Sequence, residues 1–163
     1  MRLQFTKLPK SLGPHWISVA DNIRDNQFLV SDYHLIIGQN RMKFNTLRSS
    51  IKLGVFHRMT ITRKGNQLLV IWDGREYSAT GFTDKIPKGA SWVLGQDQDE
   101  PRGGFVATER FIGNICNFQM WNIGLTKEET SQFFENPLSF GKPAVYDSPP
   151  SYKFESMNGA FFY

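Results

Sequence analysis

The residues best suited to chemistry lie in the segment LGQDQDEPRGGF, residues 94–105, where three acids occupy four consecutive positions. Asp97 and Asp99 flank one residue, so two carboxylates and the carbonyl between them can turn toward one ion. Ca²⁺ takes about six to eight oxygen ligands and tolerates irregular geometry, so this loop suits calcium. A divalent cation would also remove the repulsion between the carboxylates. A solvated acidic turn fits the same residues, and both interpretations stay open at this point.

Two other uses of these acids are disfavoured. An EF-hand fails because Arg102 stands where that loop needs glycine and Thr108 where it needs glutamate. A sandwich-fold glycosidase places two carboxylates at either side of the scissile bond, at alternate positions of one strand face. Asp97 and Asp99 alternate, but Pro101 holds the next position, and proline there predicts a loop. A glycan hydrolase is therefore the weakest alternative.

Other catalytic templates are missing from the sequence. It contains no G-x-S-x-G, no H-E-x-x-H and no phosphate-binding glycine loop. His15, His34 and His57 lie in strand-like or strand-edge segments, and none is next to a Ser or Cys in a useful arrangement, so we interpret them as structural or surface residues. Cys116 is the one cysteine, which excludes an intrachain disulfide, and its apolar neighbours predict a buried, inert thiol.

Length and composition predict one β-rich domain over residues 1–163. The chain has 14 Phe, 5 Tyr and 4 Trp, with Gly and Pro spread along its length, which favours many short strands over a helical bundle. The net charge is +4, but Lys and Arg are scattered singly, and this disfavours nucleic acid as a partner. No segment approaches the length of a membrane span, and residues 1–16 lack the apolar core of a signal peptide.

Short apolar runs separated by turn residues predict strands. These runs are 27–30, 34–38, 58–62, 67–72, 91–94 and one longer strand over 110–122. One helix is predicted over 126–135, because Thr126 suits an N-cap and Glu129 has the capping-box spacing. Asn136-Pro137 ends this helix. Closely spaced strands with a single helix predict an all-β fold, an antiparallel sandwich or jelly roll.

With these segments together, the sequence resembles the pentraxin family. The resemblance is carried by LGQDQDEPRGGF and FIGNICNFQMWNIGLTKEE, and upstream by RDNQFLV and VFHRMTITRKGNQLLVIWDG. It extends from about residue 16 to the C-terminus. It implies a two-sheet antiparallel jelly roll, a concanavalin/laminin G-like sandwich, with one short α-helix near 126–135. It also implies a calcium site on the face opposite the helix.

The resemblance further implies the ligands of a Ca²⁺ cofactor. Carried over onto the matching positions, they are Asp25, Asn26, Asp97, the backbone carbonyl of Gln98, and Asp99. Asp21-Asn22 is a competing pair, but Asp25-Asn26 directly precedes the apolar run, as the family's pair does. Family members are extracellular or cell-surface binding proteins, not enzymes. They bind phosphorylated or anionic ligands through calcium and typically form cyclic homo-oligomers.

Departures from the family pattern alter this site. Val106 stands where the family has an acid that a second Ca²⁺ needs, while Glu109 restores part of the charge, so we expect one good site and a weakened second one. Ser31 and Arg41 replace an aromatic residue and a glutamate that face choline. A guanidinium repels choline, so Arg41 and Arg102 are predicted to bind an anion such as sulfate, phosphate or an acidic sugar.

Two further departures concern the fold. Met59 occupies a position where the family has a disulfide cysteine, and the N-terminal strands that carry the other cysteine are missing from this chain. The domain is therefore interpreted as N-terminally short. Residues 1–16 are a candidate for a substitute sheet edge, and an exposed edge invites pairing with a partner.

The leading hypothesis is a calcium-dependent recognition domain for anionic small molecules or polysaccharides. The alternative is an adhesion or protein-interaction module that keeps the fold, with calcium structural or vestigial. A sandwich-fold glycan hydrolase ranks below both.

Overall fold

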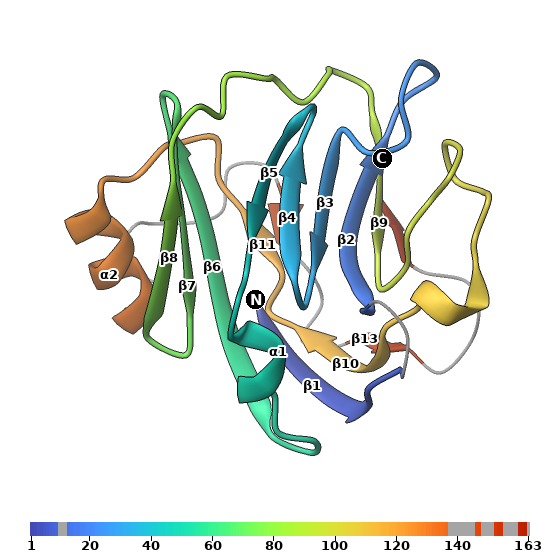
Figure 1. Ribbon diagram of the computed structural model, residues 1–163, viewed down its shortest axis with the longest axis horizontal. Coiled ribbons are helices and arrows are strands. Elements are labelled where there is room, and N and C mark those ends of the chain that lie inside the picture. Colours follow the sequence, from blue (N-terminus) through green and yellow to red (C-terminus); the bar gives the residue numbers. More distant parts are fainter. Residues whose placement is uncertain (10–12, 137–145, 148–151, 155–159, 163) are drawn as a thin grey trace.

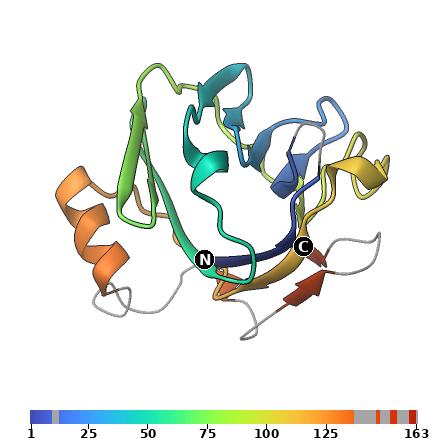
Figure 2. The same cartoon turned by 60° about the horizontal axis from the view of Figure 1, so that its bottom comes forward.

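Most of the described strands form two six-stranded sheets that lie face to face (Figures 1 and 2). The computed structural model describes residues 1–9 and 13–136, together with the backbone of three short strands within 146–162. The first sheet has the order β13 (Tyr152–Phe154), β10 (Ile112–Cys116), β1 (Arg2–Lys7), β6 (Phe56–Lys64), β7 (Gln67–Trp72) and β8 (Arg75–Ala79). The second has the order β14 (Ala160–Phe162), β9 (Ser91–Leu94), β2 (His15–Ala20), β3 (Phe28–Ser31), β4 (His34–Ile37) and β5 (Asn40–Lys43).

Smaller elements complete the described architecture. They are a strand pair, β11 (Gln119–Met120) with β12 (Tyr146–Asp147), the helices α1 (Leu47–Ser50) and α2 (Lys127–Glu135), and the 3₁₀ turn η1 (Ala107–Glu109). All strand pairs in the described residues are antiparallel. The expected all-β, two-sheet jelly roll with one helix near 126–135 is confirmed.

The hydrophobic core lies between the two sheets, and strand alternation decides which side chains enter it. Along β7, Leu68, Val70 and Trp72 face the core, whereas Leu69 and Ile71 pack with Phe134 of α2. Trp72 stacks on Trp16 of β2, with ring centroids 5.3 Å apart. This contact joins the two sheets at the second residue of β2, and so helps to hold the start of that strand in place.

Helix α2 begins at the predicted capping box. The Thr126 hydroxyl accepts a hydrogen bond from the Glu129 N–H at 3.2 Å, and the Glu129 carboxylate accepts one from the Thr126 N–H at 2.7 Å. The helix lies on the outer face of the first sheet (Figure 1), with buried Phe134 as its apolar contact. None of the described helices is both long enough and apolar enough to cross a membrane.

The Thr126→Ala substitution is expected to lower the free energy of unfolding by about 1 kcal/mol, because it leaves the Glu129 N–H of the first turn without its partner. Chemical denaturation monitored by tryptophan fluorescence measures this change. Ser131→Ala is the matched control: its hydroxyl donates to the Lys127 carbonyl within the exposed helix, so less than about 0.5 kcal/mol is expected. Equal effects of the two substitutions would contradict a role for the cap.

Two sequence expectations about strands are wrong. The single strand expected at 110–122 is divided into β10 and β11, which belong to different sheets. Between them, exposed Asn117 has a φ of 52°, a left-handed conformation that a continuous strand cannot contain. The expected substitute edge is not formed by the described part of residues 1–16, because β1 lies inside the first sheet and pairs with both β10 and β6. Its first residues, Arg2 to Gln4, are paired on both sides, so they present no open edge.

Candidate metal centre

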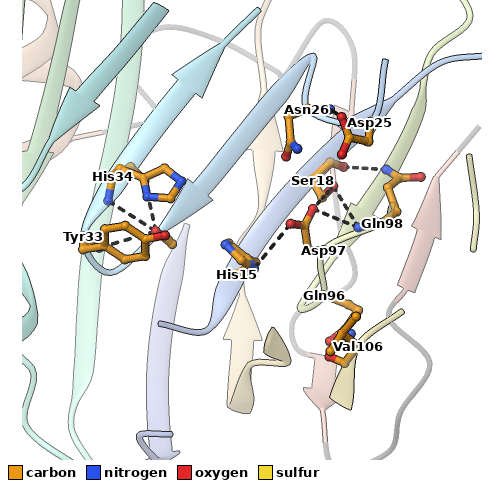
Figure 3. Close-up of polar contacts among 11 residues, drawn as sticks. His15, Ser18, Asp25, Asn26, Tyr33, His34, Gln96, Asp97, Gln98 and Val106 are labelled. Atoms are coloured by element: carbon orange, nitrogen blue, oxygen red, sulfur yellow. Dashed lines mark hydrogen bonds and ion pairs between the residues drawn. The ribbon is translucent and has the colours of Figure 1, made fainter. Parts of the chain in front are cut away.

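The acidic loop that follows β9 folds back over β2. The Gly95 N–H donates to the Trp16 carbonyl at 2.9 Å, and the Gly95 carbonyl accepts the Phe111 N–H at 2.9 Å, so both ends of the loop are held. Gly95 has a φ of 81°, which allows the turn out of the strand. The loop thereby places Asp97 over Ser18, whose hydroxyl donates to Asp97 Oδ1 at 3.0 Å (Figure 3).

Gln98 anchors the loop through its side chain. Its fully buried amide nitrogen donates to the carbonyls of Ser18 and Ser91, at 3.1 and 3.0 Å. Its amide oxygen accepts the Ser91 hydroxyl at 2.8 Å and the Arg102 N–H at 2.9 Å. The family resemblance implied only a backbone carbonyl ligand at Gln98. The structure adds a buried, fully bonded amide that fixes the positions of its acidic neighbours.

Asp97 is a buried carboxylate held among other acids. Asp97 is 6% exposed, and burial is the main reason that its pKa is raised to about 6. The Ser18 hydroxyl and the Gln98 N–H lower this pKa, while the negative charges of Asp99 and Asp25 raise it. His15 Nδ1 lies 3.6 Å from Asp97 Oδ2, and burial lowers the pKa of His15, which disfavours a charged imidazole as the partner of this carboxylate. Buried negative charge of this kind is stabilised by a bound cation.

The structure distinguishes the two Asp-Asn pairs of the loop between β2 and β3. Asp21 accepts hydrogen bonds from the N–H groups of Ile23 and Arg24 and from the Gln27 amide, so it closes its own loop. Asp25 instead lies close enough to Asp97 for its charge to raise that pKa. The buried Oδ1 of Asn26 has no hydrogen-bond partner among the described residues, and Figure 3 shows Asn26 and Asp25 beside Ser18.

The remaining predicted ligands lie around Asp97. Asp99 is exposed, and its charge acts on Asp97 and on Glu109 of η1. The pKa of Glu109 is raised by burial and by Asp97 and Asp99, and lowered by His15. Ligand atoms of His15, Asp97 and Glu109 all lie within 4.8 Å of one another. The sequence pattern around His15 indicated a structural or surface residue, because no local signal places His15 near the acids.

Val106 and the two arginines lie at the margins of this cluster. Val106 is 41% exposed, and its carbonyl accepts the Gln96 side-chain N–H at 2.8 Å (Figure 3). Arg41 is an exposed residue of β5. Burial raises the pKa of Tyr33 and lowers that of His34, and the positive charge of Arg41 opposes the first shift and adds to the second. The charges of Asp32, Glu109 and Asp97 also raise the pKa of Tyr33. Arg102 is exposed and belongs to the acidic loop itself.

The fold and this loop can be compared with known proteins. A family model described as the pentaxin family matches residues 4–144. The chain belongs to the pentaxin, or pentraxin, family.

Curated relatives of this pentraxin include short and very long proteins. The chain is 33% identical over 112 residues to the Sushi, von Willebrand factor type A, EGF and pentraxin domain-containing protein 1 of Rattus norvegicus, a match that covers 65% of the chain and 3% of that protein. It is 30% identical over 132 residues to serum amyloid P-component of Sus scrofa, covering 76% of the chain and 58% of the relative. It is 25% identical over 140 residues to human C-reactive protein, covering 80% and 61%.

A solved structure shows the same fold. The heptameric serum-amyloid-P-like pentraxin of Limulus polyphemus superimposes with a TM-score of 0.70 at 20% identity, over 98% of this chain and 79% of that one. This likeness concerns the fold alone.

Proposed function

We propose that this pentraxin chain is a calcium-dependent recognition domain for anionic ligands, and not an enzyme. The observation that carries the proposal is Asp97, a buried carboxylate whose pKa is raised first by its burial and then by the charges of Asp99 and Asp25, the neighbour in sequence of an unpartnered buried amide oxygen on Asn26. Such a group of hard oxygens without a paired Lys or Arg in the described residues is what Ca²⁺ binds. The proposed ligands are Asp25, Asn26, Asp97, the Gln98 carbonyl and Asp99.

The proposed mechanism is coordination. These residues provide fewer oxygens than Ca²⁺ accepts, so the ion would retain positions that a phosphate, sulfate or carboxylate oxygen can occupy. Arg41, an exposed residue of β5, would attract the same anion and repel a quaternary ammonium. With Val106 in place of an acid, a second ion near Glu109 would be held weakly. The proposed setting is extracellular or at the cell surface, in a cyclic homo-oligomer, as the name of the heptameric structural relative suggests.

The Asp99→Asn substitution is expected to weaken Ca²⁺ binding at least about tenfold in isothermal titration, because it removes one anionic ligand from the site. Glu100→Gln is the matched control: it removes one exposed charge from the same loop without removing a proposed ligand. The wild-type protein should bind one Ca²⁺ per chain tightly. Two equivalent tight sites, or equal effects of the two variants, would contradict this ligand assignment.

Binding of heparin, used as a polyanionic probe, separates the two candidate functions. A calcium-dependent recognition domain should lose heparin binding on chelation and in the Asp99→Asn variant. Arg41→Glu should retain Ca²⁺ and bind heparin less well. Retention of heparin binding in the absence of Ca²⁺ would support the adhesion-module alternative instead. Turnover of a polysaccharide would contradict both.

A further inference from the structure

His15 places a buried imidazole beside the proposed calcium ligands, although a calcium site uses oxygen ligands. The side chain is 6% exposed, and its Nδ1 has no hydrogen-bond partner among the described residues. Nδ1 faces Asp97 Oδ2 at 3.6 Å, which is too long for a hydrogen bond (Figure 3). A bound water or ion that contacts both groups is a common reason for a buried, unpartnered imidazole nitrogen beside a carboxylate.

The separation of these atoms fits a metal ion. Zn²⁺ binds imidazole nitrogen and carboxylate oxygen at about 2.0–2.2 Å, so adjacent ligands of a tetrahedral ion lie about 3.4 Å apart. The Nδ1–Oδ2 distance of 3.6 Å is close to this value. Glu109 can supply a third ligand, since a carboxylate oxygen lies within 4.8 Å of the ligand atoms of both partners.

The two oxygens of Asp97 have separate environments. Oδ1 accepts hydrogen bonds from the Ser18 hydroxyl and the Gln98 N–H, which fix the carboxylate in place. Oδ2 is the atom that faces His15. Support of a ligating carboxylate through its second oxygen is a common feature of metal sites.

The backbone also holds the three residues together. His15 pairs with Ser31 in the β2–β3 ladder and forms a parallel bridge with Arg110, the residue that follows Glu109. The loop that carries Asp97 is tied to the next residue of β2 through the Gly95–Trp16 hydrogen bond. The three side chains therefore converge without a change in the fold, which favours a preorganised site.

We infer that His15, Asp97 and Glu109 form a binding site for a borderline divalent cation of the Zn²⁺ class. Nitrogen and carboxylate donors suit such ions, whereas Ca²⁺ uses oxygen donors and gains nothing from an imidazole. Two carboxylates balance the charge of the ion, and three protein ligands leave one position for water or an anion. The site shares Asp97 with the proposed calcium site, so the two ions should compete, but its existence does not depend on calcium binding.

Zinc titration of tag-free protein in calcium-free buffer tests the inference. The wild-type chain should bind one Zn²⁺, and Co²⁺ in its place should give the visible absorption of a tetrahedral nitrogen–oxygen site. His15→Gln should weaken Zn²⁺ binding more than about tenfold, because an amide replaces the imidazole ligand. His34→Gln is the matched control: His34 is also buried, with its ring 6.1 Å from that of His15, and it lies outside the triad.

A pair of variants separates this site from the calcium site. His15→Gln should lose Zn²⁺ and keep Ca²⁺, whereas Asp99→Asn should lose Ca²⁺ and keep Zn²⁺. A Cys116→Ala variant should bind Zn²⁺ as the wild type does, since the buried thiol lies in β10 of the other sheet. Wild-type Zn²⁺ affinity in a folded His15→Gln variant would overturn the inference. Loss of Zn²⁺ in Asp99→Asn would do the same, because it would assign the ion to the acidic loop alone.

Discussion

The Asp97→Asn substitution is expected to raise the free energy of unfolding of the metal-free protein by about 2–3 kcal/mol at pH 8, while it abolishes Ca²⁺ binding. Burial raises the pKa of Asp97 to about 6, so the folded state keeps an ionised carboxylate above that pH at a cost. The amide removes the charge and can still accept the Ser18 and Gln98 hydrogen bonds. Denaturant unfolding with and without Ca²⁺ measures both effects.

The sign of the pH dependence follows from the same group. A carboxyl whose folded pKa lies above its unfolded value binds more protons in the folded state, so the wild-type protein gains stability from Asp97 as the pH falls from about 6 to 4. The advantage of Asp97→Asn should therefore shrink over this window. Asp99→Asn is the control. The Asp99 carboxylate is exposed, so this substitution should stabilise the metal-free protein much less than Asp97→Asn does. A destabilised Asp97→Asn protein at pH 8 would contradict the argument.

The His34→Leu substitution is expected to stabilise the protein at pH 5 by about 1–2 kcal/mol more than it does at pH 8. His34 is 2% exposed, and burial is the main reason its pKa is lowered to about 4, with further lowering by the charges of Arg41 and His15. Neither ring nitrogen has a hydrogen-bond partner in the described residues, so a leucine of similar size loses no such bond.

The sign here is opposite to that of Asp97. The unfolded chain takes up the His34 proton below about pH 6.5, while the folded chain resists it down to about pH 4, so wild-type stability falls through this window. Because leucine does not titrate, the His34→Leu variant does not have this loss of stability. Urea titrations at several pH values compare the two proteins, and NMR of the imidazole follows the titration directly. Parallel stability curves for His34→Leu and the wild type would show that burial of this ring does not oppose its protonation.

Local sequence patterns predicted those elements whose stability depends on neighbouring residues. The runs at 67–72 and 91–94 are β7 and β9 with the predicted bounds, because alternation and turn residues act over a few positions. The capping box of α2 is equally local, since Thr126 and Glu129 bond to each other. The break at Asn117 was missed because nothing in the apolar pattern of 110–122 requires a left-handed residue there.

The sequence by itself determined the chemistry available to this protein: the D-Q-D loop, two Asp-Asn pairs, an isolated valine at 106 and a single cysteine. Only the tertiary structure decided which of these groups meet. It uses Asp21 to close a loop and leaves Asp25 near Asp97, although the two pairs look alike in the sequence. It also brings His15 to Asp97 and Glu109, since the partners of β2 are β9 and β3. Such contacts arise from strand pairing between distant segments, which no local pattern encodes.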